Sequence, residues 1–241
     1  MMNMIKVRNL NYKYKNDKFE LRDINLDIEA GFVTVLVGNN GCGKTTLMRN
    51  IYGSLISNSG EVYLDDEKIS FDNLADFHKD VIYIGKSMYA DYYTVADNIE
   101  LFRTLYDRFD EEIFLKLANK FGLGNRIDSK YSILSRGQKV KADIAFAIAV
   151  KPKYIILDEP YAGLDEVSKQ DITEILQSRV SEDNVGIFIS THIIDEIEDV
   201  ADFIVMMKDG KIVKSGDRDS VIGIGKTLTE ETIDFIEDEE I

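Results

Sequence analysis

Residues 38 to 46, GNNGCGKTT, are the clearest candidates for chemistry in this sequence. They fit G-x-x-x-x-G-K-[ST] and lie between the apolar, β-branched run FVTVLV and a segment with helical character. Glycines let the backbone curl so that its N–H groups point at one anion, and a helix beginning near Lys44 adds its partial positive charge. The sequence therefore predicts a phosphate-binding loop. Its members are Gly38, Asn39, Asn40, Gly41, Cys42, Gly43, Lys44, Thr45 and Thr46.

Individual side chains of this loop suit nucleotide chemistry. Lys44 is expected to reach β- and γ-phosphates, and the Thr45 hydroxyl is expected to ligate Mg²⁺. Cys42 has no base beside it in the sequence, so we interpret it as a small spacer and not as a reactive thiol. As the only cysteine, it also excludes an internal disulfide and fits a reducing compartment.

A second candidate site follows the apolar run YIILD. Ligands of open α/β sheets bind at the carboxyl ends of the strands, where Asp158 and Glu159 would lie. Asp158 is expected to hold Mg²⁺ directly or through water, and Glu159 to polarise the attacking water. The alternative for this pair is a capped strand end. His192 follows another apolar run and is expected to contact the γ-phosphate, with a structural role as its alternative.

The segment LSRGQ, residues 134–138, has the features of a second anion cradle. Ser135 can cap a helix that runs to Val150, and its hydroxyl and the free N–H groups of the first turn suit a γ-phosphate. Gly137 permits close approach of the backbone to a ligand. The question is why one chain of 241 residues carries two such cradles.

Together with LDEP (157–160), AGLD (162–165) and TH (191–192), these motifs resemble the nucleotide-binding subunit of ATP-binding-cassette (ABC) transporters. The resemblance covers about residues 5 to 216. In that family two subunits pack head to tail, and each ATP lies between one subunit's phosphate loop and the other's LSGGQ-like segment. The resemblance therefore implies that Ser135, Gly137 and Gln138 serve a nucleotide held by a second subunit, identical or different.

The same resemblance assigns further roles. It implies ATP and Mg²⁺ as cofactors, and Asp165 at the subunit interface. Tyr14 matches the aromatic residue that stacks on adenine, although Tyr12 is close by and a plain edge-strand tyrosine is the alternative. It also implies ATPase activity that powers a separate membrane-spanning subunit. The alternatives are a soluble ABC-type ATPase acting elsewhere and an ATP sensor.

Two positions depart from the family pattern. Arg136 stands where glycine is usual, and Lys86 stands where the family has a glutamine that contacts Mg²⁺ and water. A lysine only donates and cannot ligate Mg²⁺. We therefore expect hydrolysis slower or more tightly coupled than usual, unless Lys86 faces solvent. Replacing Lys86 by Gln without effect on ATPase rate or Mg²⁺ dependence would disprove this.

The charge balance argues against a nucleic-acid partner, because 44 acidic and 29 basic residues give a net charge of −15. The longest apolar run, residues 144–150, is too short to span a bilayer. With no signal-like start, we expect a cytoplasmic protein, peripheral to the inner face of a membrane. The segment MYADYY, residues 88–93, is a candidate docking surface or else a packed loop.

The order of elements predicts the architecture that must position these residues. Strand-like runs cover 5–7, 19–28, 32–37, 60–64, 81–84, 154–158, 185–190 and 203–210, and helical spacing prevails from 94 to 150. We predict an α/β core with a mostly parallel sheet and a helical insert at about 87–139. The resemblance implies that this core is a P-loop NTPase fold with an N-terminal antiparallel β subdomain, as in ABC ATPase domains. The ATP-binding domain is expected to span 1–216, with an acidic tail at 217–241. The missing glutamine and the LSRGQK form resemble those of small exporters in this family, so the resemblance implies an exporter.

Overall fold

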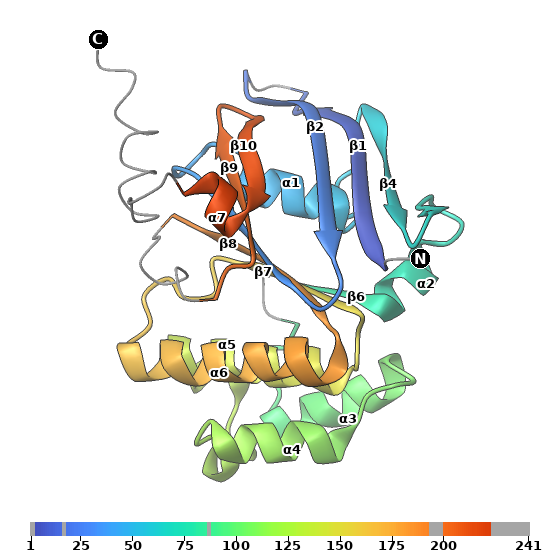
Figure 1. Cartoon of the computed structure of the whole chain (residues 1–241). Helices are drawn as coiled ribbons and strands as arrows, with labels where there is room; N and C mark the ends of the chain where they lie inside the picture. Colours follow the sequence, from blue (N-terminus) through green and yellow to red (C-terminus); the bar gives the residue numbers. More distant parts are fainter. Residues whose placement is uncertain (1–2, 16–17, 86–87, 193–199, 223–241) are drawn as a thin grey trace.

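The computed structural model describes residues 3–15, 18–85, 88–192 and 200–222 of the chain. They form two sheets with helices between and below them (Figure 1). The first sheet is antiparallel, with the order β2-β1-β4-β5. Its strands are β1 (Met4–Lys13), β2 (Glu20–Glu29), β4 (Ser59–Leu64) and β5 (Glu67–Lys68).

The second sheet has the order β10-β9-β3-β8-β7-β6, and only its edge strand β10 runs antiparallel to its neighbour. It is therefore the mostly parallel sheet that the sequence predicts. Its strands are β3 (Val33–Val37), β6 (Val81–Ile84), β7 (Tyr154–Asp158), β8 (Gly186–Thr191), β9 (Phe203–Lys208) and β10 (Lys211–Asp217).

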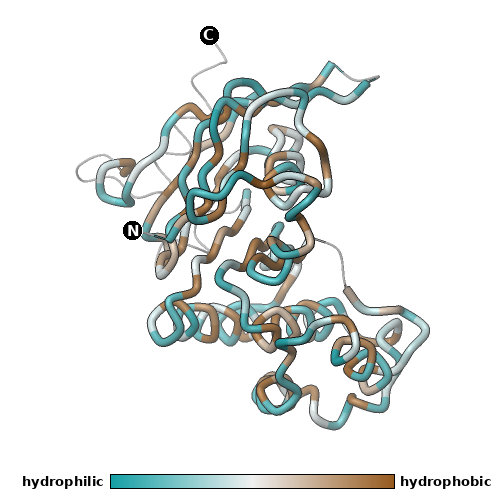
Figure 2. Tube along the Cα trace, turned by 90° about the vertical axis from the view of Figure 1, so that its right-hand side faces the viewer, coloured by the Kyte–Doolittle hydropathy of each residue, from teal (hydrophilic) through white to brown (hydrophobic). Residues whose placement is uncertain are grey.

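Alternation along the central strands fills two cores. Ile155 and Leu157 of β7 face one core, whereas Tyr154 and Ile156 face the other. The second core lies between the two sheets and holds α1 (Lys44–Ile51). Figure 2 shows apolar residues, in brown, along the strands and the inner sides of the helices. The phosphate loop thus lies between a buried strand and a buried helix.

The remaining helices lie below the large sheet in Figure 1 or at its edges. The two long ones, α5 and α6, pack against each other, and α4 packs on α5. The helices and 3₁₀ turns are α2 (Leu74–Asp80), α3 (Val95–Leu105), α4 (Glu111–Lys120), η1 (Gly124–Arg126), η2 (Tyr131–Ile133), α5 (Arg136–Ala149), α6 (Glu166–Asp183) and α7 (Arg218–Val221).

Several elements differ from the expectation. β1 is ten residues long instead of three, and β5, β10, α2 and α7 are absent from the predicted elements. β10 alternates between exposed and half-buried residues and contains none that is fully buried, so its apolar signal is weak. β10 and α7 continue the packed structure beyond residue 216, with Val221 buried in the core. The predicted tail otherwise lies outside the described residues.

Candidate functional site

The predicted phosphate loop connects β3 to α1. Gly43, the residue before α1, has φ of 114°, and a Cβ there would lie 2.5 Å from the Phe19 ring, so only glycine fits. Within the described chain, no side chain caps α1 and no acidic residue occupies its first turn. The N–H groups of that turn thus remain available to an anion.

A cavity of about 330 Å³ opens on this loop. Its lining residues are Phe19, Asn40, Gly41, Gly43, Lys44, Thr45, Thr46 and Glu159. The structure thus brings Glu159 to the phosphate loop, although 115 residues separate Lys44 from Glu159 in the sequence. Phe19, which was not predicted as a site residue, lines the cavity with its aromatic ring. Its place directly before β2 is the only feature of the sequence that indicates this role.

Lys44 lies back against its own loop. Its side chain is only 5% exposed, and Nζ donates to the carbonyls of Gly38 at 2.7 Å and Asn39 at 3.3 Å. The same Nζ lies 3.3 Å from Glu159 Oε1. The ammonium is therefore held in the cavity by carbonyls and one carboxylate, a position from which it can face a phosphate.

Glu159 occupies a left-handed backbone conformation with φ of 51°, uncommon outside glycine and asparagine. Its N–H donates to both the side-chain and the main-chain oxygen of Ser190 on β8, at 3.0 and 3.2 Å. These bonds turn the carboxylate toward the cavity, where its other oxygen, Oε2, lies 3.0 Å from Nδ1 of His192. Glu159 therefore bridges Lys44 and His192.

Asp158 is held by two hydroxyl groups. Ser190 Oγ donates to Oδ1 at 2.6 Å, and the Tyr83 hydroxyl donates to Oδ2 at 3.2 Å. Neither donor was predicted. The Thr45 hydroxyl is exposed at the cavity, whereas Asp158 is not one of the described residues that line it. Oxygen donors of this kind fit Mg²⁺, which completes its shell with waters and substrate phosphates.

The LSRGQ segment, residues 134–138, begins α5 with a capping box. Ser135 Oγ accepts from the N–H of Gln138 at 3.3 Å, and Gln138 Oε1 accepts from the N–H of Ser135 at 3.0 Å. A Cβ on Gly137 would meet only ordinary contacts, at 3.6 Å or more. Of the described residues that line the phosphate-loop cavity, none belongs to this segment. Within one chain, the LSRGQ segment and the phosphate loop therefore do not line the same cavity.

Asp165 caps α6. Its carboxylate accepts from the N–H and the hydroxyl of Ser168, at 2.9 and 3.0 Å. The hydrogen bond from the Ser168 N–H, followed by that from its hydroxyl, lowers the pKa of Asp165. The guanidinium of Arg136 lies beside the same segment, 3.4 Å from where a Cβ on Gly163 would be.

Tyr14 lies immediately after β1 and beside the phosphate loop. Its hydroxyl is 3.3 Å from Thr46 Oγ1, and its ring packs edge-on against Tyr12 with 4.9 Å between centroids. Cys42 is buried, its carbonyl accepts from the N–H of Gly210, and burial raises the pKa of its thiol. Lys86 lies outside the described residues.

The predicted docking segment is only partly exposed. Tyr92 and Tyr93 are 86% and 53% exposed, but Tyr89 is buried, stacked on Tyr131 at 4.4 Å. The segment is therefore exposed at Tyr92 and Tyr93 and packed at Tyr89, whose hydroxyl also donates to the carbonyl of Ala142. Among the described residues, no helix is long and apolar enough to cross a membrane.

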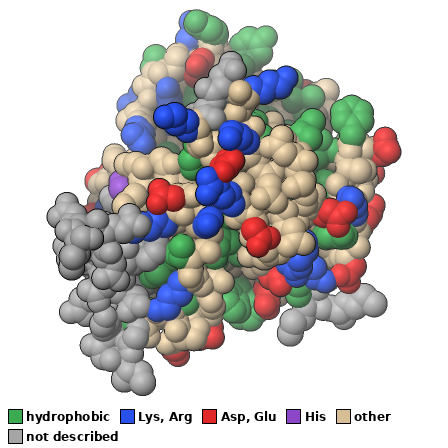
Figure 3. All heavy atoms as spheres, turned by 90° about the horizontal axis from the view of Figure 1, so that it is seen from above, with side chains coloured by type: hydrophobic (Ala, Val, Ile, Leu, Met, Phe, Trp, Pro, Cys, Tyr) green, Lys and Arg blue, Asp and Glu red, His purple; other side chains and the backbone are tan. Residues whose placement is uncertain are grey.

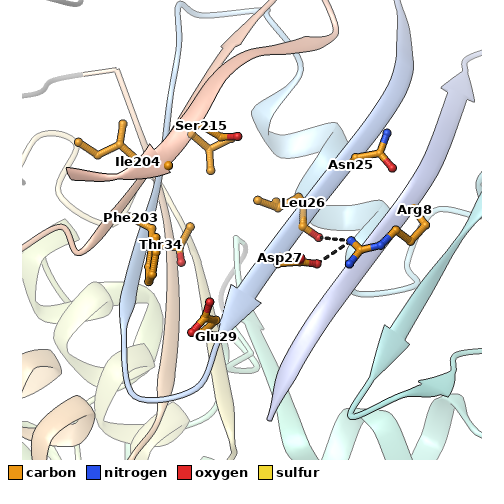
Figure 4. Close-up of a pocket in the computed structure, with 11 residues that line it drawn as sticks. Arg8, Asn25, Leu26, Asp27, Glu29, Thr34, Phe203, Ile204 and Ser215 are labelled. Carbon is orange, nitrogen blue, oxygen red and sulfur yellow. Dashed lines mark hydrogen bonds and ion pairs between the residues drawn. The ribbon is translucent and has the colours of Figure 1, made fainter. Parts of the chain in front are cut away.

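A second cavity, of about 390 Å³, lies between β2 and the β9–β10 hairpin (Figure 4). Its charged residues are Asp27, Glu29 and Arg8, and Arg8 is already paired with Asp27 at 2.6 Å. This cavity therefore holds two carboxylates and a single arginine whose charge is already paired, so a negatively charged triphosphate does not suit it. By contrast, Figure 3 shows Lys and Arg side chains gathered on the upper face of the molecule.

The sequence matches a family model described as "ABC transporter" over residues 21–162, more than half of the chain. The chain belongs to this family. The cassette is 34% identical to the "Lantibiotic transport ATP-binding protein SrtF" of Streptococcus pyogenes over 87% of its own length and 89% of that protein. It is thus an ATP-binding, ATP-hydrolysing subunit of a transporter.

Solved structures agree with this membership. One titled "Structure of ATP binding subunit of ABC transporter" superposes with a TM-score of 0.87 at 24% identity, covering 97% of the cassette and 99% of that chain. The "Dimeric structure of a post-hydrolysis state of the ATP-binding cassette MJ0796 bound to ADP and Pi" gives 0.79 at 26% identity, covering 89% and 98%. They confirm the predicted fold class.

Proposed function

We propose that two copies of the cassette close around ATP and Mg²⁺, so that each nucleotide is bound by the phosphate loop of one copy and the LSRGQ segment of the other. One observation carries this proposal: of the two predicted cradles, at the starts of α1 and α5, only that of α1 lines the Glu159 cavity among the described residues. Because every chain contains both cradles, two copies supply two complete sites.

The residues around the cavity divide the work of phosphoryl transfer. Lys44 and the N–H groups at the start of α1 would bind and orient the β- and γ-phosphates. Glu159 would accept a hydrogen bond, and then the proton, from the attacking water. His192, 3.0 Å away, would orient this carboxylate and reach the γ-phosphate. Thr45 and Asp158 would hold Mg²⁺, which neutralises charge on the phosphates when bound.

We further propose a docking face for the membrane-spanning subunit, formed by Tyr92, Tyr93 and Ile133, all more than half exposed. The carbonyls of Asp91 and Tyr93 accept from the N–H groups of Ser132 and Tyr131 at 3.0 and 2.9 Å. The exposed loop is thereby tied to the residues directly before LSRGQ. A displacement of this docking face by the membrane-spanning subunit would therefore move the LSRGQ segment that serves the partner's ATP.

We also propose where the cassette lies and in which direction its transporter works. The cassette would lie on the cytoplasmic side of the membrane, where ATP is available. The relative SrtF is named for lantibiotic transport, and the predicted exporter role fits a cargo of that peptide class.

The decisive experiment is purification of tagged Glu159→Gln cassette with MgATP from detergent-solubilised native membranes, followed by mass spectrometry. A multi-spanning protein recovered in fixed ratio, and lost in a Tyr92→Ser/Tyr93→Ser variant, supports the transporter and its docking face. Recovery of ribosomal or nucleic-acid-binding proteins instead would establish the soluble ATPase alternative. Recovery of no partner at all would contradict the transporter assignment.

A further inference from the structure

The hydroxyl of Tyr83 touches the proposed Mg²⁺ ligand. It donates to Asp158 Oδ2 at 3.2 Å from β6, the strand next to β7, while Ser190 on β8 donates to Oδ1 from the other side. Asp158 therefore has one neutral donor on each carboxylate oxygen, each from a different neighbouring strand. Such partners fix the orientation of a metal ligand.

Close packing of neighbouring residues restricts the position of the Tyr83 side chain. Its ring lies 5.5 Å from that of Tyr52, at the end of α1, and Tyr52 stacks on His78 of α2 at 4.1 Å. A Cβ on Gly85 would lie 2.0 Å from the Tyr83 hydroxyl and 2.3 Å from the ring carbon that bears it. The glycine at position 85 thus keeps free the space through which the Tyr83 hydroxyl reaches Asp158.

A phenol hydroxyl can donate to a carboxylate oxygen, as the Tyr83 hydroxyl does to Asp158. The sequence gives a reason for a well-oriented Asp158. Lys86, three residues later, replaces the glutamine that the family uses toward Mg²⁺, and a lysine cannot coordinate the ion.

We infer that Tyr83 is a positioning residue for the metal: through its hydrogen bond it sets the Asp158 carboxylate for Mg²⁺ bound with ATP. This inference rests on the proposed function, because it takes Asp158 as a ligand of Mg²⁺. It adds a residue that touches neither nucleotide nor metal but acts on both through Asp158.

The test measures binding without hydrolysis. The dissociation constant of a fluorescent, non-hydrolysable ATP analogue is determined in EDTA and in Mg²⁺ for wild type and Tyr83→Phe. We expect an unchanged constant in EDTA and one about tenfold weaker in Mg²⁺ for the variant, the size typical of lost outer-shell partners. A merely structural role would weaken both constants equally.

Two further variants make the result specific. Tyr154→Phe removes another buried hydroxyl, from the neighbouring strand β7, that has no hydrogen-bond partner among the described atoms, and it should change neither constant. Gly85→Ala keeps the Tyr83 hydroxyl but displaces it, and should reproduce the Mg²⁺-specific loss. Thermal unfolding of each variant checks that it is folded.

The outcomes separate the two proposals. An equal shift in both buffers, or no shift, in folded Tyr83→Phe overturns the inference alone. Wild-type binding that Mg²⁺ does not strengthen overturns the inference and the metal role of Asp158. No nucleotide binding by the wild type in either buffer overturns the proposed function itself.

Discussion

Lys44 and Glu159 form an ion pair across the phosphate-loop cavity, with 3.3 Å between Nζ and Oε1. The same two residues are assigned to phosphate binding and to water activation. A γ-phosphate that takes Lys44 must therefore compete with Glu159 for the ammonium. His192 at 3.0 Å offers the carboxylate a second partner when Lys44 turns to the phosphate.

Glu159→Gln should separate binding from hydrolysis. The amide removes a negative charge that opposes the triphosphate and releases Lys44 from its ion pair, so ATP affinity should stay equal or rise. Loss of the general base should lower kcat by about 10²- to 10⁴-fold. Single-turnover hydrolysis and equilibrium binding measure the two effects. Glu166→Gln, an exposed acid on α6, is the matched control, and a loss of less than threefold in Glu159→Gln would contradict the assignment.

Gly137→Ala should damage hydrolysis without damaging the fold. Within one chain a methyl group at this position meets only ordinary contacts, and alanine favours a helix over glycine by about 0.5–1 kcal/mol. The Tm should therefore stay equal or rise. If a partner's phosphate approaches the backbone here, ATPase activity should fall at least tenfold. Wild-type activity with an unchanged Tm would show that nothing approaches Gly137.

Asp165→Ala should give a pH-dependent loss of stability. Hydrogen bonds from Ser168 hold the folded pKa of Asp165 below its ordinary value of 3.8, so the stabilisation is present above that value and is lost as pH falls through the folded pKa. Urea midpoints should differ between wild type and variant at pH 7 and converge as the pH falls through the folded pKa of Asp165. A difference that persists unchanged at acid pH would refute the role of the charge.

Cys42 should react slowly with iodoacetamide. Burial raises the pKa of its thiol, so the thiolate is scarce at pH 8, and as the only cysteine it gives an unambiguous signal. The rate measured by mass spectrometry should lie well below that of free cysteine and match it in urea. A native rate equal to that of free cysteine would contradict the spacer interpretation.

The phosphate loop and the cap of α5 were predictable because their geometry is local. Glycines set the turn before α1, and Ser135 and Gln138 cap the helix three residues apart, as the sequence suggests. The contacts of Asp158 were not predictable from the sequence, because Tyr83 and Ser190 lie 75 and 32 residues away and contact Asp158 only through strand pairing. Tyr89 is buried whereas Tyr92 is exposed, a difference that their spacing in the sequence alone did not show.

ATP should join two copies of the cassette, and light scattering of the Glu159→Gln cassette measures this association. With saturating ATP we expect a mass twice the 27.4 kDa of the chain, and with ADP the mass of a single chain. The Ser135→Arg variant in the same background should bind ATP and remain a single chain. A single-chain mass for Glu159→Gln with ATP demonstrably bound would show that ATP does not join two copies.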